Sequence, residues 1–150
     1  MSNTPTPASA PTSSILDGLE GGDWRLDPVF VVAVELGERD DDSIRHAVQE
    51  AYGLRYGDYE NVSFESAHGI QRYRGQPDAV DTPLADETVR DVSVWRCCIP
   101  RDAEMLGGIL DIVYELHSYE EPVVHVVESY AARARPGVDR NTPNRAWNRD

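Results

Sequence analysis

Two parts of the sequence repeat one order: a run rich in β-branched residues is followed by a helical pattern with an apolar face. The β-branched runs are residues 29–36 and 89–99, and the helical patterns that follow them are residues 43–52 and about 103–116. Short runs of this composition favour buried strands, whereas a broad apolar stripe at helical spacing favours a helix that docks on a sheet. The chain is therefore predicted to place two helices against one sheet.

Capping residues set the predicted ends of these elements. Asp41 or Asp42 can cap the first helix, and Gly53 can end it. Asp102 can cap the second helix, and Pro100 ends the strand before it because proline has no amide hydrogen to donate to a neighbouring strand. Each helix is therefore predicted to begin directly after an aspartate.

Three further strands complete the predicted order. Residues 61–66 and 70–74 are two modest strand patterns, and Ala67-His68-Gly69 between them has the length and composition of a hairpin turn. Residues 123–130 form the last strand. The order β-α-β-β-α-β is the split βαβ, or ferredoxin-like, arrangement. The expected fold class is α+β, with an antiparallel sheet that carries two helices on one face.

The second face of such a sheet has no helix to cover it. We assign apolar side chains of the first and last strands to this face, where self-association would bury them. A homo-oligomer is therefore expected. The residues assigned to the uncovered face are Phe30, Val32, Val34, Val124 and Val126.

Composition divides the chain into a folded body and two ends. Residues 1–28 begin with a stretch rich in Ser, Thr, Pro and Ala, and are predicted to be disordered or loosely docked. Residues 29–132 are predicted to form the folded domain, and residues 133–150 an arginine-rich C-terminal tail.

Charge and hydropathy exclude several classes of partner. The net charge of -13 would repel phosphate groups, so nucleic acid is not an expected partner. No stretch reaches the ~18–20 apolar residues of a membrane span, and the first residues lack the pattern of a secretory signal. We therefore expect a cytoplasmic protein with no membrane partner. The acidity fits either salt adaptation or a function, and the sequence leaves both interpretations open.

The densest group of polar side chains follows the second helix. His117, Tyr119, Glu120 and Glu121 lie where this helix gives way to the last strand, a junction at which side chains can converge on a ligand. The sequence contains no His-Glu-x-x-His and no Cys-x-x-Cys motif. A divalent metal ion could use His117 with Glu120 or Glu121 if the turn curls. The alternative is a capping histidine beside solvated carboxylates.

Several residues of the body match one family in order and spacing. They are Gly57-Asp58-Tyr59, Ser63-Phe64, Gly69, Tyr73 and His117-x-Tyr119-Glu120-Glu121-Pro122. By this pattern the folded body resembles the CutA-like domain family: the small domain inserted into NIF-three-like dinuclear-metal hexameric proteins, and its stand-alone relatives. These in turn resemble the divalent-cation-tolerance CutA proteins. The family's last run usually reads His-Pro-Tyr-Glu-Glu, whereas this chain has Ser118 at the proline position, and residues 77–87 also depart from the family's Phe-Ile-Gly-Glu-type segment.

The resemblance implies a ferredoxin-like, GlnB-like homotrimer that acts as a binding or regulatory module rather than as a catalyst. It does not bring the dinuclear metal site, which belongs to the surrounding core of the larger relatives. Of the matched residues, Gly57 would allow a backbone conformation closed to other residues, and Phe64 and Tyr73 would pack across the hairpin. Ser63, Gly69 and Pro122 complete the structural motif.

The remaining matched residues are candidates for function. An acidic and phenolic group is costly to bury without partners, so it is expected to face a cleft or a subunit boundary. His117 and Glu120 are also the candidate metal ligands. The candidate ligand or subunit-boundary cluster consists of Tyr59, His117, Tyr119, Glu120 and Glu121.

Three functions are compatible with these residues. The leading hypothesis is an oligomeric binding module that takes a divalent cation or a small metabolite near a subunit boundary. The rival is a structural or interaction domain that docks on an unidentified protein and needs no small ligand. A hydrolase with His117 as general base and Glu120 orienting it is disfavoured, because the sequence presents no evident activated nucleophile or oxyanion donor.

Overall fold

The computed structural model describes residues 14–80 and 86–135. Residues Pro28–Ala131 form one compact unit, and the described residues on either side of it belong to a second. Much of the predicted N-terminal segment and nearly all of the predicted arginine-rich tail lie outside the described residues. The larger unit contains both helices and the whole of the polar group that begins at His117.

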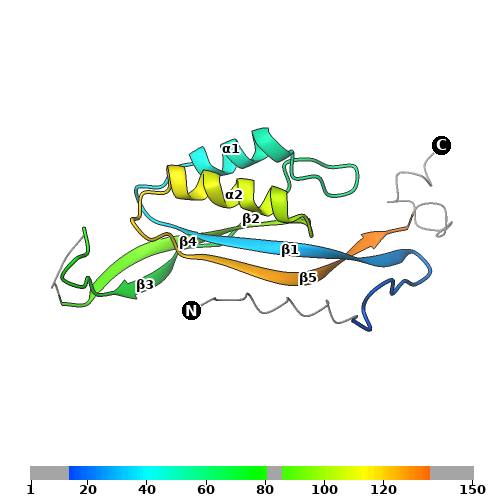
Figure 1. Ribbon diagram of the computed structural model, residues 1–150, viewed down its shortest axis with the longest axis horizontal. Coiled ribbons are helices and arrows are strands. Elements are labelled where there is room, and N and C mark those ends of the chain that lie inside the picture. The colour runs from blue at the N-terminus through cyan, green and yellow to red at the C-terminus, as the bar shows by residue number, and fades with distance from the viewer. Residues whose placement is uncertain (1–13, 81–85, 136–150) are drawn as a thin grey trace, which may run out of the picture. The chain divides into compact units, whose positions relative to one another are not determined.

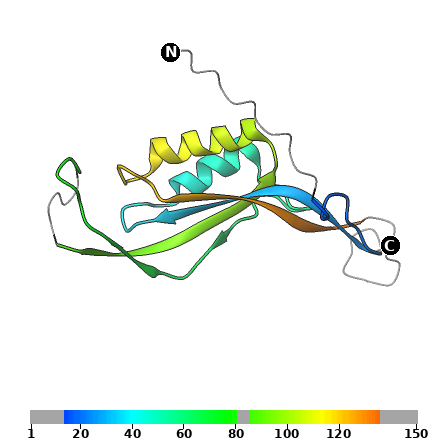
Figure 2. The same ribbon diagram turned by 60° about the horizontal axis from the view of Figure 1, so that its bottom comes forward.

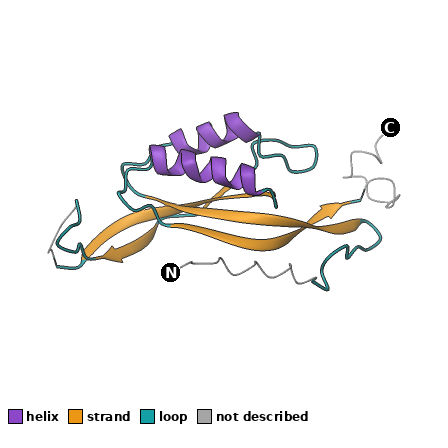
Figure 3. Ribbon diagram, in the orientation of Figure 1, coloured by secondary structure: helices purple, strands orange, loops and turns teal. Residues whose placement is uncertain are grey.

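The sheet has the strand order β2-β4-β1-β5, with β3 also paired to β4. Both helices lie on one face of it (Figures 1 and 3). The antiparallel sheet with two helices confirms the predicted ferredoxin-like α+β class. The elements are β1 (Trp24–Leu36), α1 (Ser43–Tyr52), β2 (Phe64–Glu65), β3 (Gly69–Tyr73), β4 (Thr88–Pro100), α2 (Ala103–Leu116) and β5 (Val124–Ala134).

Both helices begin, and α1 ends, where local signals predict. Asp102 caps α2, because its Oδ1 accepts hydrogen bonds from the amides of Glu104 and Met105 at 2.9 and 3.1 Å. At the start of α1, Oδ1 of Asp41 accepts the Ser43 amide at 2.9 Å. Hydrogen bonds from Ser43 lower the pKa of Asp41. Gly53 ends α1 with φ 70°, in the left-handed region.

Strands β1 and β5 are longer than predicted. β1 begins at Trp24 rather than at Val29, and β5 continues to Ala134 rather than ending at Tyr130. The charged residues of the first stretch, Arg25 and Asp27, break the apolar pattern. They pair with each other at 2.9 Å, so the strand tolerates them at an exposed position.

The predicted hairpin between residues 61–66 and 70–74 is wrong. β2 and β3 pair not with each other but with successive parts of β4, Phe64 opposite Arg96 and Tyr73 opposite Thr88. Phe64 and Tyr73 therefore do not pack across a hairpin. The long β4 has backbone groups that can pair with both segments. β2 and β3 therefore form one edge of the sheet, which is interrupted by the residues between them. Because β2 and β3 occupy one place in the sheet, the overall β-α-β-β-α-β order still holds.

The core lies between the helices and the sheet. Val32 and Val34 have exposed fractions of 0% in that core, and Phe30 and Val124 pack against it. Their assignment to the uncovered face is therefore wrong, and Val126 shares the side of Val124 by strand alternation. The uncovered face instead carries the intervening residues, among them Val31 opposite Cys98 and Ala33 opposite Arg96. No described helix covers this face (Figure 2).

Among the described residues, no helix has the length and apolar character needed to cross a membrane.

Candidate polar site at the end of helix α2

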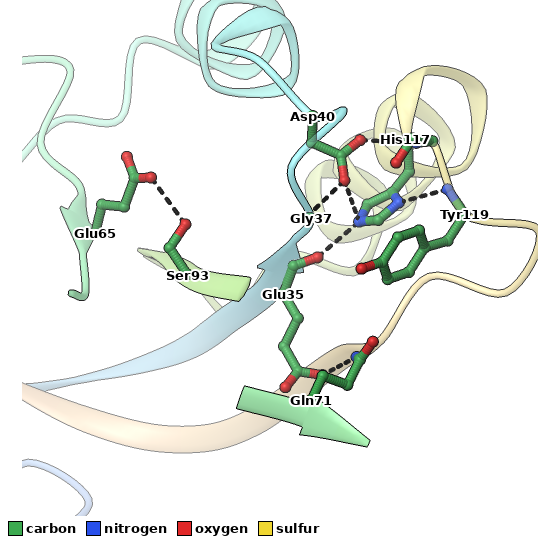
Figure 4. A network of polar contacts seen from close by, with 9 residues as sticks. Glu35, Gly37, Asp40, Glu65, Gln71, Ser93, His117 and Tyr119 are labelled. Atoms are coloured by element: carbon green, nitrogen blue, oxygen red, sulfur yellow. Dashed lines mark hydrogen bonds and ion pairs between the residues drawn. The ribbon is translucent and has the colours of Figure 1, made fainter. Parts of the chain in front are cut away.

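His117 points into the protein rather than into solvent. It follows the last residue of α2, and its side chain has an exposed fraction of 0%. Its Nδ1 accepts the amide of Tyr119 at 3.0 Å, and its Nε2 lies 2.7 Å from the carbonyl oxygen of Glu35 in β1 (Figure 4). Because Nδ1 is the acceptor, Nε2 carries the proton and donates to that carbonyl. Both ring nitrogens are thereby engaged, which leaves the imidazole no free nitrogen for a metal or a proton transfer.

Asp40 completes this buried arrangement, although no sequence motif pointed to it. Its carboxylate accepts the Ser118 amide at 2.7 Å and the Gly37 amide at 2.9 Å, and lies 3.4 Å from Nε2 of His117. The side chain is 2% exposed, so these donors compensate the burial of its charge. The available signal was the spacing Gly37-x-x-Asp40, since the Asp40 amide also closes a turn onto the Gly37 carbonyl at 3.0 Å.

Tyr119 packs between His117 and Gly37. Its ring meets the imidazole edge-on with centroids 4.9 Å apart. A Cβ atom added to Gly37 would lie 2.5 Å from the Tyr119 hydroxyl oxygen, so the close approach requires glycine. Burial raises the pKa of Tyr119, and the neighbouring Tyr73 and Asp40 raise it further. The phenol therefore stays protonated at neutral pH.

The two glutamates of the cluster form hydrogen bonds with residues other than His117. Oε2 of Glu120 accepts the Val80 amide at 2.9 Å, and Oε1 of Glu121 accepts the Tyr114 hydroxyl at 3.4 Å. The structure thus brings His117 and Tyr119 together but assembles no joint site from His117 and Glu120. Within residues 14–80 and 86–135, no group of three or more His, Cys, Asp or Glu side chains is arranged to hold a metal ion.

A cavity of about 1030 Å³ adjoins Tyr119 and Glu120. One side is formed by residues 71–80 and the other by residues 118–121 and Val123, with Glu35 and Arg39 also in the wall. Its acidic lining residues are Glu35, Asp78, Glu120 and Glu121, and its basic lining residues are Arg39, Arg72 and Arg74. This hollow beside the predicted cluster can accommodate a small molecule.

Tyr59 does not join His117 within one chain. It closes a tight turn with Tyr56 through backbone hydrogen bonds of 2.8 and 3.1 Å, and its side chain is 75% exposed. Gly57 in this turn has φ 60°. The loop after α1 lies at the opposite end of the helical layer from the end of α2 (Figure 1).

The structural motif residues fall in three places. Tyr73 lines the cavity beside Tyr119. Ser63 and Phe64 line a smaller hollow of about 160 Å³, where the Arg96 guanidinium lies 5.0 Å from the Phe64 ring centroid. Gly69 begins β3, and Pro122 is buried next to Glu121.

The sequence matches no protein-family model and no curated protein. Solved structures are nevertheless similar. A Bacillus cereus protein related to NIF3 has a TM-score of 0.57 and 17% identity, over 77% of this chain and 28% of that protein. A Staphylococcus aureus protein has a TM-score of 0.46 and 21% identity, over 72% of this chain and 25% of that one. CutA1 from Oryza sativa has a TM-score of 0.49 and 12% identity, over 69% of this chain and 81% of its own.

The chain shares its fold with part of the NIF3-related protein. It spans about a quarter of the length of the two bacterial proteins. This fold is the one that the CutA-like resemblance implied, so the expectation of a CutA-like fold is confirmed. At this level of identity the likeness concerns the fold alone.

Proposed function

We propose that this protein is a non-catalytic binding module whose ligand is a small metabolite held in the cavity beside Tyr119 and Glu120. The observation that carries the proposal is a large cavity lined by charged side chains of both signs. It lies next to a polar cluster in which both ring nitrogens of the buried His117 already have hydrogen-bond partners. Catalysis by His117 is disfavoured, because both of its ring nitrogens hold backbone groups.

A divalent cation is the second candidate ligand, because four carboxylates line the same cavity and oxygen ligands suit hard cations. A bare cation fits less well than a metabolite. Oε2 of Glu35 accepts a hydrogen bond from Nε2 of the Gln71 side chain at 3.1 Å, while Glu120 and Glu121 each accept a hydrogen bond elsewhere in the chain. These carboxylates would have to leave their donors to converge on one ion.

We also propose that the chain assembles with itself and that residues 29–132 carry the function. The uncovered sheet face supports self-association, because it presents apolar side chains such as Val31, together with the exposed Phe64 on β2. A homotrimer, with the cavity near a subunit boundary, is the assembly that the CutA-like resemblance implies. Tyr59, which is exposed and remote from His117 in its own chain, would then be free to approach a neighbouring subunit.

A native mass spectrum of the full chain, purified without added metal or chelator, tests the proposal. Ser118→Phe places a ring in the cavity wall at an exposed position whose backbone amide alone is bonded to Asp40. Ala51→Phe adds the same ring at an exposed position of α1, outside the cavity. We expect the protein to be an oligomer that carries excess mass. This excess mass should be retained in Ala51→Phe and lost in Ser118→Phe.

A different result would favour another function. A bare oligomer in every sample, still without excess mass after incubation with millimolar Mg²⁺ or a metabolite extract, would contradict the binding module. That outcome would favour the structural or protein-interaction domain. Excess mass equal to a metal ion alone would favour the cation over the metabolite.

A further inference from the structure

The charged groups of the cavity differ in whether the chain already satisfies them. Three of the lining carboxylates, Glu35, Glu120 and Glu121, accept hydrogen bonds from side chains or backbone of the same chain. Among the basic residues, Arg72 is paired with Glu87 at 3.1 Å. Among the described residues, the side chains of Arg39 and Arg74 have no hydrogen-bond or ion-pair partner, and neither has the Asp78 carboxylate. Two guanidinium groups and one carboxylate of the cavity are therefore unpaired, so positive charge is in excess among the unpaired groups.

Unpaired arginine side chains are notable in a protein with a strongly negative net charge. At -13 the chain as a whole repels anions, so an anion needs direct contact with cationic side chains in order to bind. Arg39 comes from the loop after β1 and Arg74 from the end of β3, so two separate elements bring guanidinium groups to one cavity. Guanidinium groups are well suited to carboxylate and phosphate oxygens, which can accept two parallel hydrogen bonds.

The chain itself already places a carboxylate in this cavity. Oε2 of Glu120 accepts the Val80 amide at 2.9 Å across 40 residues of sequence, and both residues line the cavity. The Val80 amide is thus a donor that already holds a carboxylate oxygen. An external oxyanion in the same place would compete with Glu120 for this donor, and would be repelled by the Glu120 charge.

From these contacts we infer that the cavity is an oxyanion site, in which Arg39 and Arg74 bind the ligand and the ligand displaces the Glu120 carboxylate from the Val80 amide. The inference rests on the proposed function and specifies its ligand as an anion that bears carboxylate or phosphate groups. Glu120 is then a built-in competitor that lowers the affinity for weak anions. A ligand with two or more oxyanion groups satisfies both arginines and the freed amide together.

Isothermal titration calorimetry of the full chain at about 0.1 M salt tests the inference, since this salt screens interactions beyond roughly 10 Å. The probes are citrate for carboxylates and pyrophosphate for phosphates. Arg55→Ala is the matched control for Arg39→Ala and Arg74→Ala. Like them, Arg55 is an exposed arginine, and it lies outside this cavity. We expect one probe to bind once per chain, with affinity about tenfold or more lower in Arg39→Ala and Arg74→Ala and unchanged in Arg55→Ala.

A second pair of variants tests the competition. Glu120→Gln and Glu121→Gln each remove one negative charge from the cavity, but only the first removes the carboxylate that occupies the Val80 amide. Affinity for the probe should rise in both variants and rise more in Glu120→Gln. Equal affinity changes in the two would overturn the competition with Glu120.

The remaining outcomes separate the inference from the proposed function. Binding of neither probe, or equal loss in Arg55→Ala, overturns the oxyanion site. If the purified protein retains a ligand that survives the Arg39→Ala/Arg74→Ala double substitution but is lost in Ser118→Phe, the binding module stands and the oxyanion inference fails. If no ligand is retained and no probe binds, both fail.

Discussion

Replacing His117 should destabilise the fold rather than remove a ligand contact. His117→Ala deletes a fully buried imidazole, its hydrogen bond to the Glu35 carbonyl and its acceptor for the Tyr119 amide. Each of the two hydrogen bonds contributes about 1 kcal/mol to the free energy of unfolding. The unpaired backbone groups and the cavity left behind together cost about 1 kcal/mol more, so the expected loss is about 3 kcal/mol. For a chain of this size the midpoint of thermal unfolding should fall by about 6–12 °C.

Two conservative variants, His117→Asn and His117→Gln, separate the contributions of the two hydrogen bonds. Asn at position 117 can place an acceptor where Nδ1 stands and keep the Tyr119 bond, whereas Gln can reach the Glu35 carbonyl with its amide nitrogen. Each should recover part of the loss. Urea unfolding followed by circular dichroism measures the free energy of unfolding at constant slope. If His117→Ala cost less than about 0.5 kcal/mol while abolishing ligand binding, the buried structural role of His117 would be refuted.

Three other predictions concern single contacts. Gly37→Ala should cost about 1–3 kcal/mol in urea unfolding, because its Cβ would collide with the Tyr119 ring; Gly22→Ala, where nothing lies within 4 Å, is the control. Burial raises the pKa of Cys97 to about 12, so the unfolded thiol ionises first and stability should fall from about pH 9 upward. Cys97→Ala should flatten that fall. Asp102→Ala should cost about 1 kcal/mol by removing the α2 cap, unlike exposed Asp111→Ala.

The starts of both helices and the end of α1 could be predicted because their signals are local. Asp102 and Gly53 act on backbone groups within a few positions of themselves, and neither needs knowledge of the rest of the chain. The prediction of a hairpin was wrong for the opposite reason. Whether residues 64–65 and 69–73 pair with each other or with β4 depends on a partner far along the sequence, and both pairings satisfy the same composition.

The orientation of β1 could not be read because its pattern is apolar on both faces. Val29 to Val34 contain no polar residue to mark the exposed side, so a shift of one position exchanges Val32 and Val34 with Val31 and Ala33. The burial of Val32 and Val34 under the helices settles the choice.

The polar site was predicted in part. The sequence singled out His117 and Tyr119, which the fold does bring together, but not Asp40, which lies nearly 80 residues earlier and is one of three consecutive aspartates. It also grouped Tyr59 with them, although the loop after α1, to which Tyr59 belongs, and the end of α2 lie at opposite ends of the helical layer (Figure 1). The inward orientation of His117 depends on the Glu35 carbonyl, a backbone group that no sequence pattern marks.

An amide chemical-shift titration of the ¹⁵N-labelled full chain with citrate and with pyrophosphate tests directly whether the cavity beside Tyr119 binds a small anionic ligand. Binding there should produce saturable shifts at Val80, Ser118 and Tyr119 and leave the amides of the remote Tyr56–Tyr59 turn unchanged. Shifts confined to that turn, or no saturable shift with either anion, would contradict binding in this cavity.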